Sequence, residues 1–200
     1  MTINVAVIYY SATGTVHALA EAVADGAVAA GAEVRLRRVT DLPPADTDGP
    51  VATLDDLVWA DAFAFGTPTR FGTPAAPLKR FIDDTAGLWR EGALADKPAT
   101  AFTAAFNRHG GNEATILALG NVFYHWGALI VPPGYTDPAV SAAGGNPYGT
   151  SFVTGPRGTG PDDAALAAAR FQGRRLALIT MKLRGDRHSA ASARETVGSA

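Results

Sequence analysis

The 200-residue sequence predicts an α/β fold, a doubly wound five-stranded parallel sheet with helices on both faces. Five apolar strand-like segments alternate with segments whose apolar residues recur at three- and four-residue steps, as they do in helices. A hydroxyl-rich turn joins the first strand directly to the first helix, and further polar loops follow later strands. A chain that alternates strand and helix in this way has to return each strand parallel to the last.

Each expected element has its own signal in the sequence. The strands are short segments rich in apolar residues, and we expect them at Ile3–Tyr10, Glu33–Val39, Asp61–Gly66, Ala99–Phe106 and Ala128–Val131. The helices have one apolar face, and we expect them at Thr15–Ala30, Leu54–Trp59, Ala75–Thr85, Glu113–Tyr124 and Pro161–Leu183. Gly31 provides a C-cap signal for the first helix, and Pro132 ends the last strand.

The connecting segments complete a single domain, residues 1–183. Residues 41–50 hold prolines, glycines and aspartates, and we expect a surface loop there. Residues 134–160 are rich in glycine, and so long a loop is more often functional than idle. The polar, small-residue tail at 184–200 carries no capping signal, so we expect it to be disordered.

Composition narrows the classes of function. The net charge is −2, which does not indicate a nucleic-acid or membrane partner. No cysteine is present, which excludes disulfides, thiol nucleophiles and thiolate metal sites. The four histidines show no ligand spacing, so we expect no metal site. No secretory leader or long apolar segment is visible, and we expect a cytoplasmic protein.

The turn Ser11–Val16 (Ser-Ala-Thr-Gly-Thr-Val) can hold a phosphate. The first N–H groups of a helix have no internal partner and lie at the positive end of its dipole, and nearby hydroxyls can add donors. The turn lacks the Gly-Lys-Ser/Thr ending of a Walker loop and the three glycines of a dinucleotide loop. A hydroxyl-rich loop of this kind is similar to the FMN phosphate loop of flavodoxins. An ordinary N-cap turn is the alternative.

The second strand alternates three arginines, Arg35, Arg37 and Arg38, with apolar residues. These cations could bind the 2′-phosphate of NADPH. Charge on one side of a strand more often protects the edge of a sheet, and we favour that interpretation. The sequence therefore does not separate NADH from NADPH as electron donor.

Three of the polar loops follow the first, third and fourth strands, at residues 11–15, 68–72 and 103–111. In a parallel sheet these loops meet beyond the carboxyl ends of the strands, where ligands bind. The first loop can hold a phosphate, and the other two can bind a flat ring through backbone N–H groups. A flavin needs such donors near its N5 and O4 atoms.

Several sequence blocks in a fixed order identify a resemblance that covers Ile3 to Leu183. The blocks are Gly-Thr-Pro-Thr-Arg-Phe-Gly at 66–72, Gly-Leu-Trp at 87–89, Tyr-His-Trp-Gly at 124–127, Val-Pro-Pro-Gly-Tyr at 131–135 and Gly-Gly-Asn-Pro-Tyr-Gly at 144–149. The chain resembles the WrbA family of flavodoxin-like NAD(P)H:quinone oxidoreductases. This resemblance implies strand order 2-1-3-4-5, non-covalently bound FMN, nicotinamide and quinone substrates, and a homotetramer.

The resemblance also implies the roles of particular residues. The phosphate loop falls on Ser11, Ala12, Thr13, Gly14, Thr15 and Val16. The ring-edge loop falls on Pro68, Thr69, Arg70 and Phe71. The second ring loop falls on Ala104, Ala105, Phe106, Asn107, Arg108, His109 and Gly110. The catalytic aromatic wall over the flavin falls on Trp89, His125 and Tyr135, with Trp89, Thr13 and Trp126 next to the substrates.

Some positions depart from the family pattern. The second ring loop lacks the usual Ser-Thr-Gly-Thr-Gly-Gly sequence and is about one residue longer. Thr13 stands where the family often has a tyrosine, and Trp126 replaces a second histidine, which would narrow the pocket. The resemblance therefore does not specify the individual contacts of residues 104–111.

The function that follows is FMN-dependent two-electron reduction of quinones by NAD(P)H. Hydride would pass through flavin N5, and one slot shared by donor and acceptor implies ping-pong kinetics. The alternatives are a one-electron flavodoxin-like carrier that binds a partner reductase, a reductase of azo or nitro aromatics, and a non-catalytic protein of the same fold. A carrier is usually strongly acidic, whereas this chain is nearly neutral.

Overall fold

The chain folds around a parallel sheet with the predicted strand order. The computed structural model describes residues 2–40 and 50–197, with side chains up to residue 185. The main strands are parallel and lie in the order β2-β1-β3-β5-β6, which confirms the predicted order. Their bounds are β1 Asn4–Tyr9, β2 Glu33–Arg38, β3 Ala62–Arg70, β5 Pro98–Ala105 and β6 Leu129–Ile130. The expected loop at 41–50 lies, except for Pro50, outside the described residues.

The fifth position of the sheet is shared by two short strands. β6 pairs with the start of β5, and β7 (Ser151–Val153) pairs with its end at Thr103–Ala105, both in parallel. Pro132 and Pro133 follow β6 at once and cannot donate to a strand ladder, so a later segment has to cover the rest of β5. The predicted loop at 134–160 therefore contains β7 and a short helix, α6 (Pro138–Ala142). A two-residue strand, β4 (Thr73–Pro74), pairs antiparallel with the end of β3.

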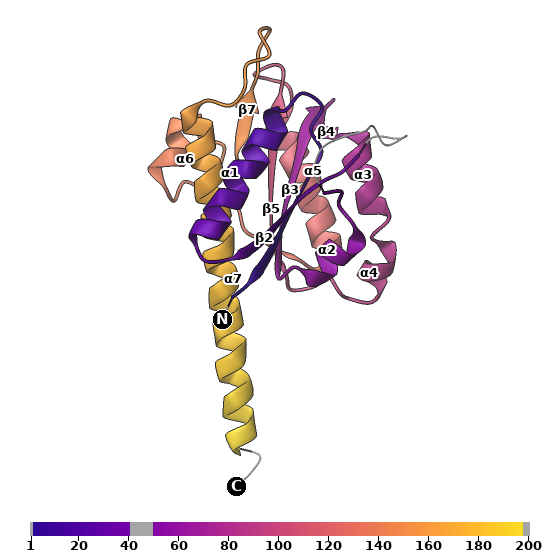
Figure 1. Cartoon of the computed structure of the whole chain (residues 1–200), viewed down its shortest axis with the longest axis vertical. Coiled ribbons are helices and arrows are strands. Elements are labelled where there is room, and N and C mark those ends of the chain that lie inside the picture. Colours follow the sequence, from indigo (N-terminus) through magenta and orange to yellow (C-terminus); the bar gives the residue numbers. More distant parts are fainter. Residues whose placement is uncertain (1, 41–49, 198–200) are drawn as a thin grey trace.

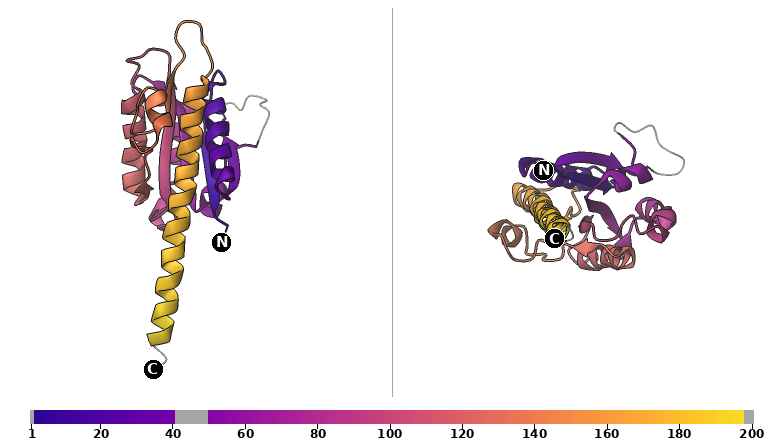
Figure 2. Two further views of the ribbon diagram at one scale, coloured as in Figure 1. Left: turned by 90° about the vertical axis from the view of Figure 1, so that its left-hand side faces the viewer. Right: turned by 90° about the horizontal axis from the view of Figure 1, so that it is seen from below.

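Helices cover both faces of the sheet (Figures 1 and 2). One face is covered by α1 (Thr15–Ala29) and α7 (Asp163–Val197). The other is covered by α2 (Leu54–Trp59), α3 (Ala76–Asp83), α4 (Ala86–Arg90) and α5 (Asn112–Trp126). Helix α4 lies just after the predicted helix Ala75–Thr85, in a segment for which the sequence predicted no helix. The strands between these layers are buried on both sides, which explains why β1 and β5 have continuous apolar sequences.

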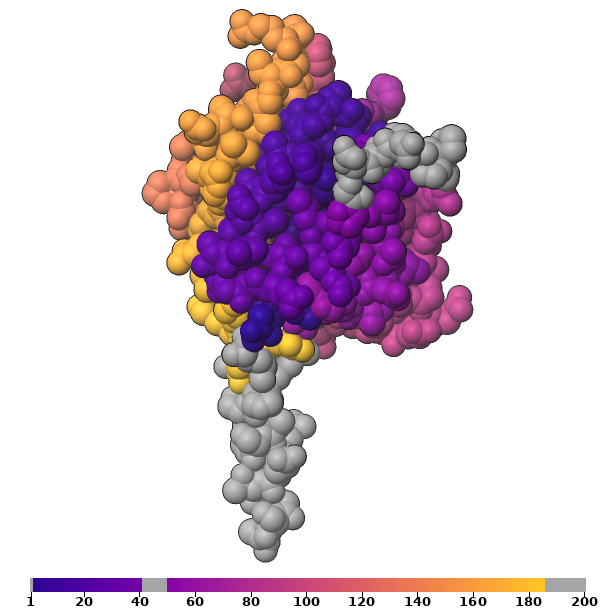
Figure 3. Space-filling model, in the orientation of Figure 1, coloured from indigo at the N-terminus to yellow at the C-terminus, as the bar shows by residue number. Residues whose placement is uncertain are grey.

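Helices α1 and α7 lie side by side on their face of the sheet, as Figure 3 shows from the outside. The contact depends on one glycine in each helix. A Cβ atom on Gly26 would overlap the carbonyl oxygen of Arg170, and a Cβ atom on Gly173 would overlap that of Val23. The two backbones therefore approach more closely than any side chain at these positions would permit.

The C-terminal tail differs from the expectation. Helix α7 runs on to Val197 and extends beyond the sheet (Figure 1), so the expected disorder at 184–200 is wrong for residues 184–197. The segment contains alanines and arginines, which favour helix, and it has no proline. A helix that has already formed propagates through such residues at little cost, whereas a separate tail would first have to nucleate one.

The edge-strand interpretation of the arginines is supported by their contacts. β2 is the outer strand of the sheet, and Arg35 and Arg37 both bind Oδ1 of Asp56 on α2, at 3.2 and 3.1 Å. The Arg35 guanidinium also lies 4.1 Å from the centre of the Trp59 ring. Two of the three arginines are thus occupied within the fold.

Among the described helices, none is long and apolar enough to cross a membrane.

Candidate functional site

The three predicted loops meet in one cavity beyond the carboxyl ends of β1, β3 and β5. It has a volume of about 450 Å³. The loop residues that line it are Ser11, Ala12, Thr13, Thr15, Val16, Pro68, Arg70, Ala104, Ala105 and Phe106. The parallel pairing of the strands places their ends together, as the topology rule requires. Predicted residues from all three loops therefore share a site.

The first loop has the geometry of a phosphate cradle. Gly14 precedes α1 with φ of +90°, a left-handed conformation that favours glycine, and its N–H donates to Ser11 Oγ at 3.1 Å. The first helical hydrogen bond is donated by Ala18 to the Gly14 carbonyl. The N–H groups of residues 15–17 therefore have no helical acceptor and remain at the positive end of the dipole.

The ring-edge loop is held rigidly and presents an uncovered aromatic ring. The hydroxyl of Thr69 contacts the hydroxyl of Thr115 and donates to the Gly110 carbonyl, so this loop and the second ring loop are tied together. Phe71 has φ of +52° and is fully exposed. A non-glycine residue in this region is strained, and such strain is typical of ligand-binding sites.

Residues of the second ring loop line two different cavities. Ala104 and Ala105 end β5, and Phe106, which is 57% exposed, lines the same cavity as the phosphate loop. Arg108 and His109 instead line a second, larger cavity on the other side of the loop. The sequence blocks alone did not distinguish these two directions, because a longer loop can change the side on which its tip lies.

The cavity has a further wall that the sequence did not assign. Thr154, Pro156, Arg157 and Gly158, between β7 and α7, complete its lining. The Thr154 and Gly155 N–H groups donate to the Ala105 and Phe106 carbonyls, so this wall is attached to the second ring loop. The available signal was the unusual length and glycine content of residues 134–160. Among the described residues that line the cavity there is no carboxylate, but there are two arginines, Arg70 and Arg157.

A pair of titratable side chains stands behind the phosphate loop. The Tyr9 hydroxyl lies 2.6 Å from His17 Nδ1, in a small cavity that Ser11, Gly14 and Arg38 also line. Burial raises the pKa of Tyr9 and outweighs the opposing effect of Arg38. His17 is only partly exposed, because its ring packs against Tyr9.

The predicted aromatic wall does not assemble within one chain. Trp89, which is 53% exposed, and His125 line a shallow groove between the α3–α4 segment and α5, and Tyr135 lines the second cavity. None of the three lines the cavity of the phosphate loop. Trp126 is 6% exposed and packs against Phe63, Phe65 and Phe123 in the core. Trp126 also lines the groove that Trp89 and His125 form, so its expected position beside a substrate stays a prediction.

The residues that are brought together fit FMN. The helix N-terminus and hydroxyls suit a phosphate, and the lack of lining carboxylates favours a dianion there. The adjoining ring loops offer a flat ring an apolar surface at Ala104–Phe106 and Pro68. Among the described residues, no group of three or more potential metal-binding side chains occurs.

Comparisons with known proteins point to the same class. The chain is 41% identical to a protein named NAD(P)H dehydrogenase (quinone) from Deinococcus radiodurans, across 92% of this chain and 98% of that protein. A protein of the same name from Geobacter sulfurreducens is 42% identical, across 91% and 100%. The crystal structure of a flavodoxin, WrbA-like protein from Agrobacterium tumefaciens matches with TM-score 0.71 and 27% identity, across 90% and 98%.

An archaeal flavodoxin at 21% identity has TM-score 0.65, which supports the fold alone. The WrbA resemblance is confirmed by the named relatives and by the WrbA-like structure. Residues 3–139 match the NADPH-dependent FMN reductase family, and with these relatives the match shows that the chain belongs to that family.

Proposed function

We propose that this protein is an FMN-dependent oxidoreductase that transfers two electrons from NAD(P)H to quinones. One observation carries the proposal: a phosphate cradle and two ring-binding loops, from distant parts of the sequence, line one cavity without a carboxylate. The family match and the relatives named NAD(P)H dehydrogenase (quinone) support the same reaction. When bound, FMN would supply the redox chemistry, taking hydride at N5 and giving two electrons to a quinone.

The chain itself would bind the cofactor, orient its ring and stabilise charge. The loop Ser11–Val16 would hold the phosphate, and backbone groups of Thr69–Phe71 would align the ring edge. Arg70 and Arg157 bring positive charge to the cavity, which favours anionic nucleotides and a negatively charged reduced product. Because one cavity would receive donor and acceptor in turn, we expect ping-pong kinetics.

The roles of Trp89 and His125 need a second copy of the chain. Both are exposed and lie outside the cavity of their own chain. We therefore propose that the protein forms a homo-oligomer, with the homotetramer as the expected state, in which a neighbouring subunit supplies this aromatic wall. The cytoplasmic location expected from the sequence stays a prediction.

An anaerobic titration tests the proposed function directly. The purified protein is loaded with FMN, and the flavin absorbance is followed while NADH and then benzoquinone are added. We expect full bleaching by NADH and full recovery with one equivalent of quinone. Bound FMN that NADH cannot reduce would contradict the proposal and place the protein among the carriers that depend on a partner reductase.

A further inference from the structure

The phosphate loop can balance the charge of a bound phosphate only in part. Residues 11–16 contain no charged side chain, so the loop offers a phosphate its hydroxyls, its N–H groups and the positive end of the α1 dipole. That dipole amounts to about half an elementary charge, whereas a phosphate monoester carries between about 1.5 and 2 negative charges at neutral pH. A cationic side chain beside the loop would therefore complete the site.

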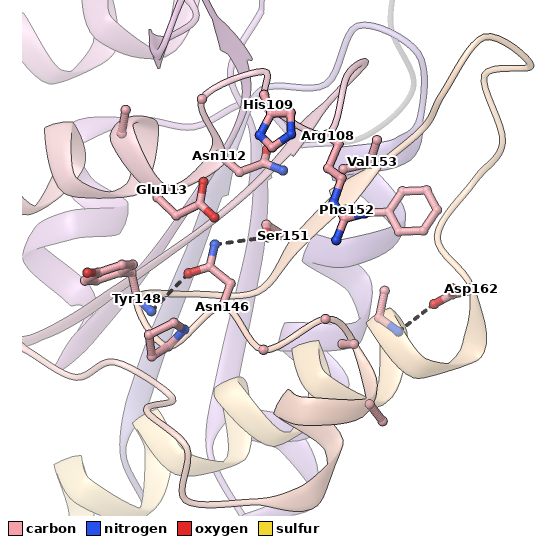
Figure 4. Close-up of a pocket in the computed structure, with 18 of the residues that line it drawn as sticks. Arg108, His109, Asn112, Glu113, Asn146, Tyr148, Ser151, Phe152, Val153 and Asp162 are labelled. Carbon is pink, nitrogen blue, oxygen red and sulfur yellow. Dashed lines mark hydrogen bonds between the residues drawn. The ribbon is translucent and has the colours of Figure 1, made fainter.

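The arginines near the site differ in the cavity that they line. Arg108 lines the second cavity, which Figure 4 shows, and Arg38 lines the small cavity behind the phosphate loop. Arg70 lines the flavin cavity, but its Nη1 donates to the Thr69 carbonyl at 3.2 Å, which keeps the guanidinium at the ring-edge loop. Arg157 lines the flavin cavity together with the phosphate loop and is the arginine best placed to serve it.

Arg157 is presented by a tight turn between β7 and α7. The Gly158 N–H donates to the Gly155 carbonyl at 3.0 Å, so Pro156 and Arg157 occupy the two central positions of the turn. Proline fixes the backbone angle that the first central position requires. Figure 1 shows this turn at the end of the sheet at which α1 begins. The sequence Gly-Pro-Arg-Gly thus places an arginine at the tip of a loop that lines the flavin cavity.

Hydrogen bonds hold the base of this turn. The Thr154 N–H donates to the Ala105 carbonyl at 2.9 Å, and the Thr159 N–H and hydroxyl both donate to the Thr154 carbonyl. In Figure 4 the chain leaves the sheet after Val153 and returns to the start of α7 at Asp162. The backbone that carries the arginine is therefore positioned before a ligand binds, which lowers the entropic cost of a contact made by its side chain.

The Arg157 side chain has no partner among the described residues. It is exposed, and no hydrogen bond or ion pair joins it to another described side chain or carbonyl. Arg35, Arg37 and Arg184, by contrast, are each paired with an aspartate. An unpaired guanidinium beside a cavity without carboxylates can donate two hydrogen bonds at once to an anion such as a phosphate.

We propose that Arg157 binds the phosphate of the flavin cofactor and thereby selects FMN over riboflavin. The proposal rests on the proposed function and deepens it, because Arg157 lies outside the three loops that the sequence assigned to the cofactor. Residues 11–16 would hold the phosphate through N–H groups and hydroxyls, and Arg157 would donate to it from the wall formed by residues 154–158. Arg70 would remain at the edge of the ring.

Two flavins that differ only in the phosphate test this role. Protein freed of flavin is titrated with FMN and with riboflavin at about pH 8, where the phosphate is a dianion, and binding is followed by the change in flavin fluorescence. Arg157→Ala should weaken FMN binding about tenfold, the size of one charge-assisted contact, and should leave riboflavin binding unchanged. Arg157→Lys keeps the charge but loses the paired donors, so it should weaken FMN binding less.

Two other arginines provide the controls. Arg174→Ala removes the same charge from an exposed position of α7 and should leave both affinities unchanged. Arg70→Ala should change the two affinities by the same factor, because both flavins have the ring that its loop would contact. A loss specific to FMN in the Arg70 variant, in place of the Arg157 variant, would overturn the proposal.

Two further results would also overturn the phosphate role of Arg157. Equal weakening of FMN and riboflavin binding in Arg157→Ala would show that the turn only supports the cavity wall, and unchanged FMN binding would show that the side chain makes no contact. In both cases the proposed function stands as long as the unaltered protein binds FMN that NADH reduces. Failure of the unaltered protein to bind FMN would instead overturn the proposed function.

Discussion

Asp56 joins the outer strand of the sheet to helix α2. Its side chain is 4% exposed. Oδ2 accepts hydrogen bonds from the Thr53 N–H and hydroxyl, and Oδ1 accepts from Arg35 and Arg37. Burial by itself raises the pKa of Asp56, but the Thr53 hydrogen bonds and the two arginines outweigh it, so the pKa is lowered. The contacts that guard the sheet edge therefore also cap α2.

Replacement of this carboxylate should destabilise the protein. Asp56→Ala leaves two arginines without their counter-ion and removes one half of the capping box of α2, and we expect a loss of about 2–3 kcal/mol at pH 7 in urea unfolding. Because the folded pKa is depressed, the stabilisation is complete above the ordinary carboxyl pKa of about 3.9 and is lost as the pH falls below it. Asp55→Ala, at an exposed neighbouring position, is the control. A difference between variant and parent that stays constant down to pH 2 would contradict this account.

At the scale of elements, the close contact of α1 and α7 positions the phosphate loop. The loop is the N-terminal end of α1, and α7 packs along that helix through Gly26 and Gly173. Gln172 next to it is buried and binds Thr100, Ala101 and Thr150, which joins α7 to the sheet. The register of α7 is therefore set by polar contacts as well as by close packing.

A methyl group at this contact should separate the two helices. Gly173→Ala would place its Cβ against the Val23 carbonyl, and backbone atoms cannot turn away, so we expect a loss of about 2–3 kcal/mol in thermal or urea unfolding. Gly185→Ala on the same helix meets no atom within 4 Å and should be neutral or stabilising by about 0.5–1 kcal/mol. Equal stabilities of the two variants would show that the glycine contact is unimportant.

For the whole molecule, the separation of Trp89 from the flavin cavity matters most. The groove that Trp89 and His125 line cannot by itself bind FMN as we expect, because none of the phosphate-loop residues line it. A single chain thus has a cofactor cavity without the expected aromatic wall, and the expected wall without the cavity. The homo-oligomer that we propose would bring these two halves together.

Subunit complementation tests this association. Trp89→Ala should keep FMN bound but lower turnover with both substrates at least tenfold. Thr13→Glu puts a carboxylate into the exposed phosphate loop and should prevent FMN binding by charge repulsion. Co-expression of the two variants should restore part of the activity, since mixed oligomers contain an intact cavity beside an intact Trp89. A monomer in solution, or no recovery in the mixture, would contradict the proposal.

The sequence by itself determined the parallel sheet and the position of the turn at residues 11–16. These features depend on local signals: periodicity, glycine and proline positions, and a segment that follows one strand and begins one helix. The strand order came from the resemblance to the WrbA family. The rule that ligands bind beyond the carboxyl ends of parallel strands then placed residues of three loops at one cavity. The buried position of Trp126 was not visible in the same way, because a tryptophan in a family block can serve a site or a core.

The tertiary structure alone decided which side of a loop a residue faces and which surface a helix face covers. Arg108 and Phe106 are two residues apart, yet they line different cavities. β7 pairs with the part of β5 that the short β6 leaves uncovered, and Arg35 and Arg37 are occupied because α2 brings Asp56 to them. These contacts join residues that are distant in sequence, and no local sequence pattern specifies which residues will meet.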